Sequence, residues 1–235
     1  MAEQTPLRVA FLLFPQVTQL DLTGPAQVLH RLGATTIDLV AAEREPIPTD
    51  AGFALLPTAT FDEAVQPDIL CIPGGAGIND AIEHEPTLAW VRRAAGGAQW
   101  VTSVCVGSLL LGAAGLLEGY RATCHWSQHH HLSAFGAIPV RERVVCDRNR
   151  VTGGGVTAGI DFGLTLVAAI RGEDHARLVQ LSLEYDPAPP FNCGSPEKAD
   201  AATMARYLAL SAAAQPRRDA RFAAAAVRLR SSVNA

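Results

Sequence analysis

The chain has 235 residues, of which 49% are hydrophobic and 18% charged, and its formal net charge is −4. This balance argues against general nucleic-acid binding, and no apolar run approaches the roughly 18 residues that would span a membrane. The five cysteines are dispersed without a C-x-x-C pair, which suits a reducing cytoplasm better than a disulfide framework. The N-terminal residues lack the basic and apolar regions of a signal peptide, so we expect a cytoplasmic protein.

Apolar runs and turn residues predict alternating strands and helices along most of the chain. Strands are predicted at residues 7–14, 37–40, 68–72, 99–104 and 121–124, with hairpins within 44–60 and 140–152. Helices are predicted at 23–32, 79–95, after residue 106, and at 127–135, 158–170, 174–185 and 200–229, the last broken near Pro216. This alternation indicates an α/β fold with a mostly parallel sheet covered on both faces. We expect one α/β domain over residues 1–195 and a C-terminal helical extension, residues 196–235, packed on it.

Cys105 stands where a β-branched apolar strand meets a Leu- and Ala-rich helix, with Gly107 two residues later. A nucleophile at such a strand–turn–helix elbow leans out over the sheet edge, close to helix N–H groups. The positive end of the helix favours the thiolate over the thiol. The alternative is a buried core cysteine, the usual state of free cysteines; the elbow favours the nucleophile.

Three turns are expected at the carboxyl ends of the strands, where open α/β sheets place their sites. They cover residues 21–25, 73–77 and 105–108. Asp21 would bring a carboxyl group near the thiol, and since two adjacent anions repel, only one of them should ionise readily. The backbone N–H groups of Gly75 and Val106 are the natural pair of oxyanion donors.

The remaining polar features predict less specific roles. His125 and His129 have the i, i+4 spacing of a metal pair, but no glutamate lies between them as in H-E-x-x-H, so we expect no metal. The His-rich helix is interpreted as solvated or partly packed, and only His125 as a residue of the cleft. The C-terminal arginines are most simply a solvated helical face. Val156 follows three glycines and is a candidate pocket or gating residue.

Several segments together resemble the DJ-1/PfpI superfamily and, within it, the bacterial isocyanide hydratase branch. The segments that carry the resemblance are residues 11–15 (FLLFP), 19–25 (QLDLTGP), 71–75 (CIPGG), 101–108 (VTSVCVGS), 122–126 (ATCHW), 153–162 (GGGVTAGIDF) and 180–192 (QLSLEYDPAPPFN). One position departs from that branch: Val106 stands where threonine is often found.

The resemblance implies a flavodoxin-like three-layer sandwich, a homodimer and no cofactor. It also implies that Cys105 attacks the terminal carbon of an isocyanide, that Asp21 manages the protons, and that the thioimidate is hydrolysed to an N-substituted formamide. Two other kinds of function stay open. One is a glyoxalase- or deglycase-like enzyme acting on 2-oxoaldehydes, and the other is a non-catalytic small-molecule- or redox-sensing domain.

Overall fold

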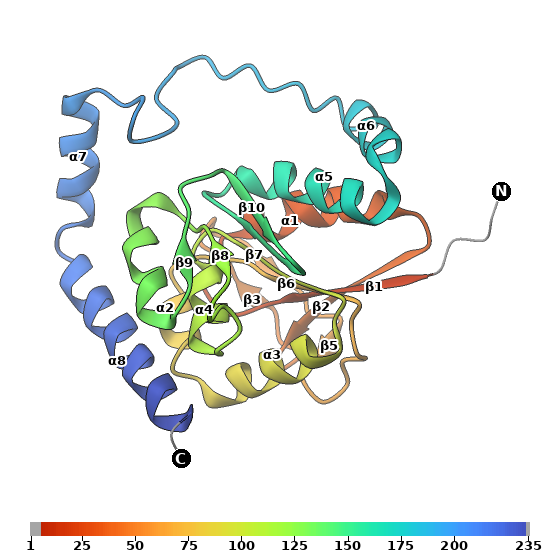
Figure 1. Ribbon diagram of the computed structural model, residues 1–235, viewed down its shortest axis with the longest axis horizontal. Coiled ribbons are helices and arrows are strands. Elements are labelled where there is room, and N and C mark those ends of the chain that lie inside the picture. The colour runs from red at the N-terminus through yellow and green to blue at the C-terminus, as the bar shows by residue number, and fades with distance from the viewer. Residues whose placement is uncertain (1–5, 234–235) are drawn as a thin grey trace.

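A computed structural model describes residues 6–233, and a mostly parallel seven-stranded sheet lies at its centre (Figure 1). In spatial order the strands are β10 (Val144–Asp147), β11 (Arg150–Gly153), β7 (Trp100–Val104), β6 (Ile69–Ile72), β1 (Leu7–Leu12), β2 (Thr35–Ala41) and β5 (Ala59–Thr60). Only β10 and β11 pair antiparallel within this sheet. The predicted α/β class is therefore confirmed. The expectations about residues 1–5, 234 and 235 lie outside the described residues.

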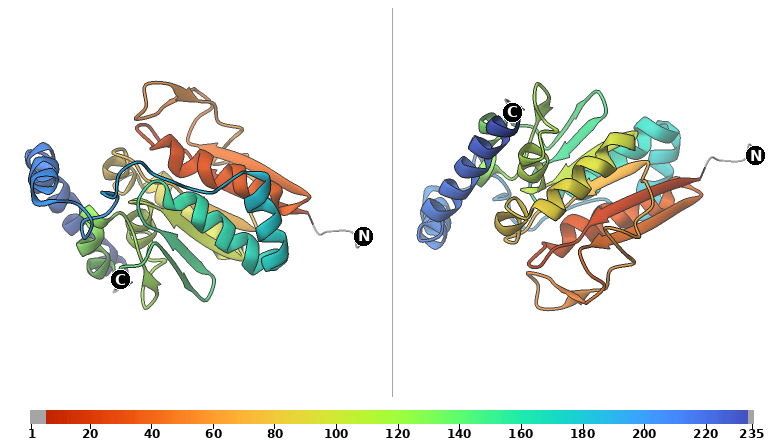
Figure 2. Two further views of the ribbon diagram at one scale, coloured as in Figure 1. Left: turned by 90° about the horizontal axis from the view of Figure 1, so that it is seen from above. Right: turned by 90° about the horizontal axis from the view of Figure 1, so that it is seen from below.

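Helices cover both faces of the sheet and make it the middle layer of a flavodoxin-like sandwich (Figure 2). On one face α1 (Gln19–Leu29) and α5 (Ala158–Arg171) pack side by side, and α6 (Glu173–Ser182) packs on α5. On the other face lie α3 (Glu85–Gly97) and α4 (Gly107–Ala113). Strands covered in this way must be apolar on both sides, which is why β6 is a continuous buried run, ILCI.

Shorter elements surround this sandwich. They are η1 (His30–Leu32), the hairpin of β3 (Ile47–Pro48) and β4 (Ala54–Leu55), α2 (Ile78–Ala81), the pair β8 (Arg121–Ala122) and β9 (Ile138–Pro139), and the 3-10 helix η2 (Trp126–Phe135). Both predicted hairpins are present. No helix of the described residues combines the length and apolarity that a bilayer span requires.

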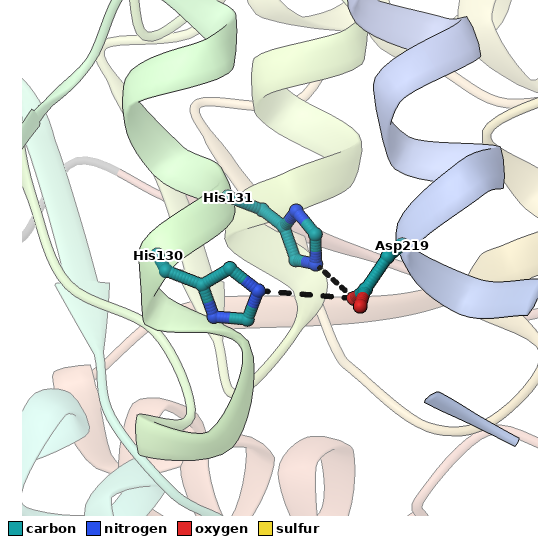
Figure 3. Close-up of side chains that lie close together, drawn as sticks. All are labelled: His130, His131 and Asp219. Carbon is teal, nitrogen blue, oxygen red and sulfur yellow. Dashed lines mark hydrogen bonds and ion pairs between the residues drawn. The ribbon is translucent and has the colours of Figure 1, made fainter. Parts of the chain in front are cut away.

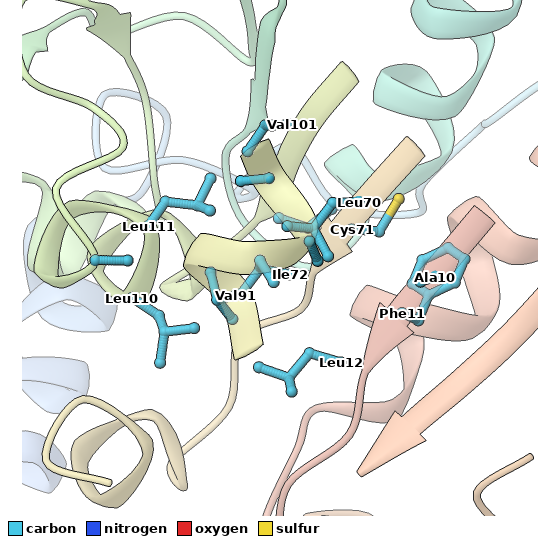
Figure 4. Packing of buried hydrophobic residues seen from close by; sticks show 14 of the residues in the cluster. Ala10, Phe11, Leu12, Leu70, Cys71, Ile72, Val91, Val101, Leu110 and Leu111 are labelled. Carbon is cyan, nitrogen blue, oxygen red and sulfur yellow. The ribbon is translucent and has the colours of Figure 1, made fainter. Parts of the chain in front are cut away.

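The core lies between the sheet and its helices (Figure 4). Phe11 and Leu70 are fully buried on their strands, and Val91, Leu110 and Leu111 meet the sheet from α3 and α4. Each such side chain stabilises the fold by roughly 1.5–3 kcal/mol relative to an exposed position. This dense packing fixes the strand ends that carry the candidate site.

The first helix begins four residues before its predicted start. Thr18, not Thr23, is the N-cap, and Pro25 lies inside the helix. The predicted start at residue 23 depends on Pro25, because proline is tolerated in the first turn of a helix. Packing of α1 on α5 outweighs this local preference: Gly159 is small enough for Pro25 to approach closely. Asp21 therefore lies in the first turn of α1 and not in a preceding loop.

Two other helix predictions are corrected. The helix expected at 79–95 is two helices, α2 and α3, separated near His84, because Pro86 fits only the first turn of a new helix. The segment expected as a polar α-helix at 127–135 is the 3-10 helix η2, in which His129 and His131 are buried.

The C-terminal residues form α7 (Ala201–Ser211) and α8 (Gln215–Val233), which lie beyond the carboxyl ends of the parallel strands (Figures 1 and 2). The break precedes Pro216, which takes the second position of α8, where its missing N–H costs little. Phe222, Ala225 and Ala226 are buried in the same core cluster as the sheet. Helix α8 packs against η2 and α4 through this face.

The packing of α8 generates a stability prediction. Phe222→Ala removes a fully buried ring and is expected to lower the free energy of unfolding by about 3–5 kcal/mol. Val227→Ala, on the same helix but 54% exposed, should change it by no more than about 0.5 kcal/mol. Urea denaturation followed by circular dichroism measures both. Equal effects of the two changes would contradict the buried anchoring of α8.

Candidate active site

Cys105 occupies the turn between β7 and α4, and its backbone is left-handed, with φ 58°. Few non-glycine residues adopt this conformation, and it is tolerated here because the surroundings hold the backbone. The Cys105 N–H lies 3.0 Å from the carbonyl oxygen of Gly153 and 2.8 Å from that of Gly154. The predicted elbow is therefore present, and the loop after β11 holds it from the side.

Two glycines allow the elbow to close. A Cβ on Gly107 would lie 2.2 Å from the carbonyl oxygen of Ile72, so α4 could not start so near the end of β6 with any other residue. A Cβ on Gly74 would lie 2.8 Å from the Asp21 carboxyl, 2.8 Å from the Val106 nitrogen and 2.9 Å from the Cys105 Cβ. The carboxyl, the thiol and the first N–H groups of the elbow thus converge on the space left by Gly74.

Asp21 is only 1% exposed, and its carboxyl group lies close to Cys105. Its Oδ2 accepts a hydrogen bond of 2.8 Å from the Gly74 N–H. Its Oδ1 is buried and has no hydrogen-bond partner among the described residues. A buried carboxylate with one oxygen unsatisfied is costly, so this group favours its protonated form.

Burial raises the pKa of Asp21 to about 7, although the Gly74 N–H and the Cys105 side chain act in the opposite direction. Burial and the charge of Asp21 raise the pKa of the Cys105 thiol well above its usual value, while the Val106 N–H opposes the rise. The expected effect of the helix end is thus present but outweighed by burial. Because a negative charge on either Cys105 or Asp21 disfavours a second one on the other, the pair keeps one shared proton over a wide pH range.

A cavity of about 270 Å³ opens above the thiol. Of the predicted residues, Cys105, Gly75, Val106, His125 and Val156 all line it. Cys105 is only 6% exposed, yet a small molecule in this cavity would meet it. Next to the predicted donor pair, the N–H groups of Gly75 and Val106, lies the Gly74 N–H, which donates to Asp21.

The ring of His125 is fixed in the cavity wall. Its Nδ1 lies 2.8 Å from the Ser127 hydroxyl, and the ring lies close enough to Gly155 that a Cβ there would come within 3.2 Å of it. Burial and the nearby charge of Arg218 lower the pKa of His125. The ring is therefore neutral at neutral pH, and it cannot supply a fixed positive charge to the thiolate.

Sequence reasoning missed the part of the cavity wall that comes from the C-terminal helices. Tyr207, Arg218 and Phe222 line the cavity together with Cys105. The solvated face predicted for the C-terminal arginines is therefore wrong for Arg218. No motif marks these positions, but isolated aromatic residues in an Ala- and Arg-rich helix are a signal that one face is buried.

The histidine cluster is partly packed, as expected, and is held by α8 (Figure 3). The His131 Nε2 lies 2.9 Å from Oδ1 of Asp219, and the exposed His130 lies 3.7 Å from the same oxygen. One ligand atom from each of the three residues lies within 4.8 Å of the others, so this group could hold a metal ion. It lies outside the wall of the cavity that contains Cys105.

His129 instead hydrogen-bonds the Val140 carbonyl, so the suggested His125–His129 pair does not form.

Fold and site together define a doubly wound α/β protein with a cysteine at a strand–helix elbow and a buried carboxyl group beside it. The model of the DJ-1/PfpI family matches residues 7–169. The chain belongs to the DJ-1/PfpI family.

Two similar proteins match most of this chain and most of their own length. It is 54% identical over 198 residues to the isonitrile hydratase of Pseudomonas putida, covering 84% of this chain and 87% of that protein. A crystal structure of a THiJ/PfpI family protein from Pseudomonas syringae superposes with a TM-score of 0.89 at 44% identity, covering 94% of this chain and 91% of that one. The HTH-type transcriptional regulator GbdR of Pseudomonas aeruginosa is 28% identical over 191 residues, which cover 78% of this chain and 52% of the regulator.

The raised pKa of Asp21 generates a second stability prediction. Between pH about 4 and 7 the folded state holds a proton on Asp21 that the unfolded state has lost, so stability should fall as the pH rises through this window. At pH 8 the ionised carboxyl costs the fold about 4 kcal/mol at most, since each pKa unit corresponds to about 1.4 kcal/mol.

Asp21→Asn keeps an oxygen that can accept from the Gly74 N–H but never ionises. It should therefore be more stable than the wild type at pH 8 and differ little from it at pH 4. Thermal denaturation at the two pH values measures this difference. A variant that is equally destabilised at both would contradict the shifted pKa.

Proposed function

We propose that this protein is an isocyanide hydratase that adds water to R–N≡C and releases an N-substituted formamide. The observation that carries the proposal is the buried Cys105–Asp21 pair on a small-molecule cavity. It occurs in a chain that is 54% identical to an isonitrile hydratase, isonitrile being another name for isocyanide. The name of that relative and the geometry of the pair point to the same reaction.

In the first half of the reaction, the terminal carbon of the isocyanide must receive both a nucleophile and a proton. The sulfur of Cys105 attacks the terminal isocyanide carbon and forms a C–S bond. The single proton of the Cys105–Asp21 pair is delivered to that same carbon, which gives the thioimidate R–N=CH–S–Cys105. A buried pair that holds one proton and one negative charge supplies both partners of this addition.

The second half releases the product. Water adds its oxygen to the thioimidate carbon, and the nitrogen takes up a proton. The C–S bond then breaks, R–NH–CHO leaves, and the remaining water proton returns to the pair. Asp21 is placed to act as the base for this water, since its pKa of about 7 matches neutral conditions.

Other residues support these steps in the proposal. The N–H of Val106 stabilises negative charge on the Cys105 sulfur, and the N–H of Gly75, a residue of the cavity wall, serves as a second donor. His125 and Val156 shape the cavity wall, and Val156 is the residue proposed to gate it. Nothing in this sequence of steps requires a cofactor. A cytoplasmic homodimer is the assembly that we propose.

The alternatives differ in the electrophile they need. A 2-oxoaldehyde is attacked at a carbonyl carbon and develops an oxyanion, whereas an isocyanide needs its proton on the attacked carbon. The Cys105–Asp21 pair, with its one shared proton, favours the isocyanide. The similarity to GbdR is the observation that favours a sensing role, but it is weaker than the similarity to the hydratase.

The proposal predicts that the purified protein converts 4-nitrophenyl isocyanide to its formamide and that Cys105→Ala lowers kcat/KM at least about 1,000-fold. Cys146→Ala is the matched control, because Cys146 is an exposed free cysteine outside the cavity, and it should retain wild-type activity. Liquid chromatography with mass spectrometry measures the formamide and the adduct on Cys105.

Two results would contradict the proposal. One is an equal, background rate for the wild type and Cys105→Ala. The other is faster Cys105-dependent turnover of methylglyoxal than of the isocyanide, which would favour the glyoxalase alternative. Binding of the isocyanide without turnover would favour a sensor.

A further inference from the structure

Arg218 presents a charge to the cavity that no residue of the described chain neutralises. Its side chain is half-buried and lines the cavity together with Cys105. Its guanidinium forms no hydrogen bond or ion pair with any residue between 6 and 233, whereas Arg221, one turn later on α8, is paired with both Asp80 and Glu83. Arg221 thus anchors α8 through ion pairs, whereas the guanidinium of Arg218 is available to bind a ligand in the cavity.

The surroundings of Arg218 keep its charge uncompensated. Within the described chain, no Asp or Glu side chain lines this cavity. The neighbouring Asp219 is directed to His131 and Gln215. The charge is felt inside the cavity, because it helps to lower the pKa of His125, which lines the same wall. Half-burying an unpaired guanidinium costs free energy, and an anion seated beside it would recover part of that cost.

Part of the wall is apolar or aromatic, next to polar residues such as Asn79 and Gln128. Phe222, Val156 and Ile78 line the cavity, as does Tyr207, whose ring is held against Trp126 at a centroid distance of 4.8 Å. This apolar part of the wall fits a hydrocarbon body between the reacting carbon and a charged end. A guanidinium binds a carboxylate through two parallel hydrogen bonds, which fixes the orientation of that end.

We propose that Arg218 is a specificity-determining residue that binds a carboxylate on the substrate. On this proposal, which rests on the proposed hydratase activity, the substrate class is an isocyano carboxylic acid with an apolar linker. Its isocyanide carbon meets Cys105 while its carboxylate meets Arg218. The C-terminal helix α8 therefore selects the substrate, and the elbow performs the chemistry.

The test compares 4-isocyanobenzoate with 4-isocyanobenzamide, which has nearly the same shape and no charge. The wild type is expected to favour the carboxylate, and Arg218→Gln to lower the carboxylate-to-amide ratio of kcat/KM by about 10- to 100-fold. Arg217→Gln is the matched control, because Arg217 is the adjacent residue, is exposed and does not line the cavity. It should leave the ratio at the wild-type value.

Two outcomes would overturn the proposal. One is a ratio that Arg218→Gln does not change. The other is an equal loss for both compounds, which would show that Arg218 acts on the Cys105–Asp21 pair and not on the substrate.

Calorimetry of the products makes the test independent of turnover. The wild type should bind 4-formamidobenzoate at least about tenfold more tightly than 4-formamidobenzamide, and Arg218→Gln should abolish this preference. If neither isocyanide is turned over but the preference is found, the hydratase activity fails and the anion site stands. If both isocyanides are turned over without any preference, the hydratase activity stands and the anion site fails.

Discussion

The contact between the Cys105 thiol and the buried Asp21 carboxyl is the interaction on which the rest of the site depends. Neither group is in water, and among residues 6–233 no basic side chain lies beside either of them to compensate a second negative charge. The pair therefore keeps one proton near neutral pH, and that proton can rest on oxygen while the sulfur carries the charge. An isocyanide carbon must receive both a sulfur nucleophile and a proton, and this pair can supply both.

The scaffold brings the two groups together through backbone constraints and not through a network of side chains. Gly74 leaves the space in which the carboxyl, the thiol and the Val106 N–H meet, and Gly107 lets α4 start against the end of β6. The left-handed backbone of Cys105 is held by the carbonyls of Gly153 and Gly154. These constraints come from three separate strand ends, so the geometry of the site is a property of the whole parallel sheet.

Local patterns predicted the parts of the structure that local forces decide. Apolar strands such as β6 and the elbow at Cys105 follow from residue type and spacing. The proximity of Asp21 to the thiol follows from the parallel sheet, whose carboxyl strand ends meet at one edge. Two features could not be found in this way. The start of α1 depends on packing against Gly159, which is remote in sequence. The contribution of Tyr207, Arg218 and Phe222 to the cavity wall depends on where α7 and α8 return to the sheet, and no local pattern encodes that position.

The shared proton can be measured most directly through the pH dependence of Cys105 alkylation by iodoacetamide, followed by mass spectrometry in the wild type and in Asp21→Asn. The account predicts that alkylation of the wild type rises through pH about 7, as the pair loses the first of its two protons. In Asp21→Asn the rise in alkylation near pH 7 should be absent. Alkylation should increase only at a pH well above the pKa of free cysteine, because burial still disfavours the thiolate. Identical profiles for the two proteins would contradict the account.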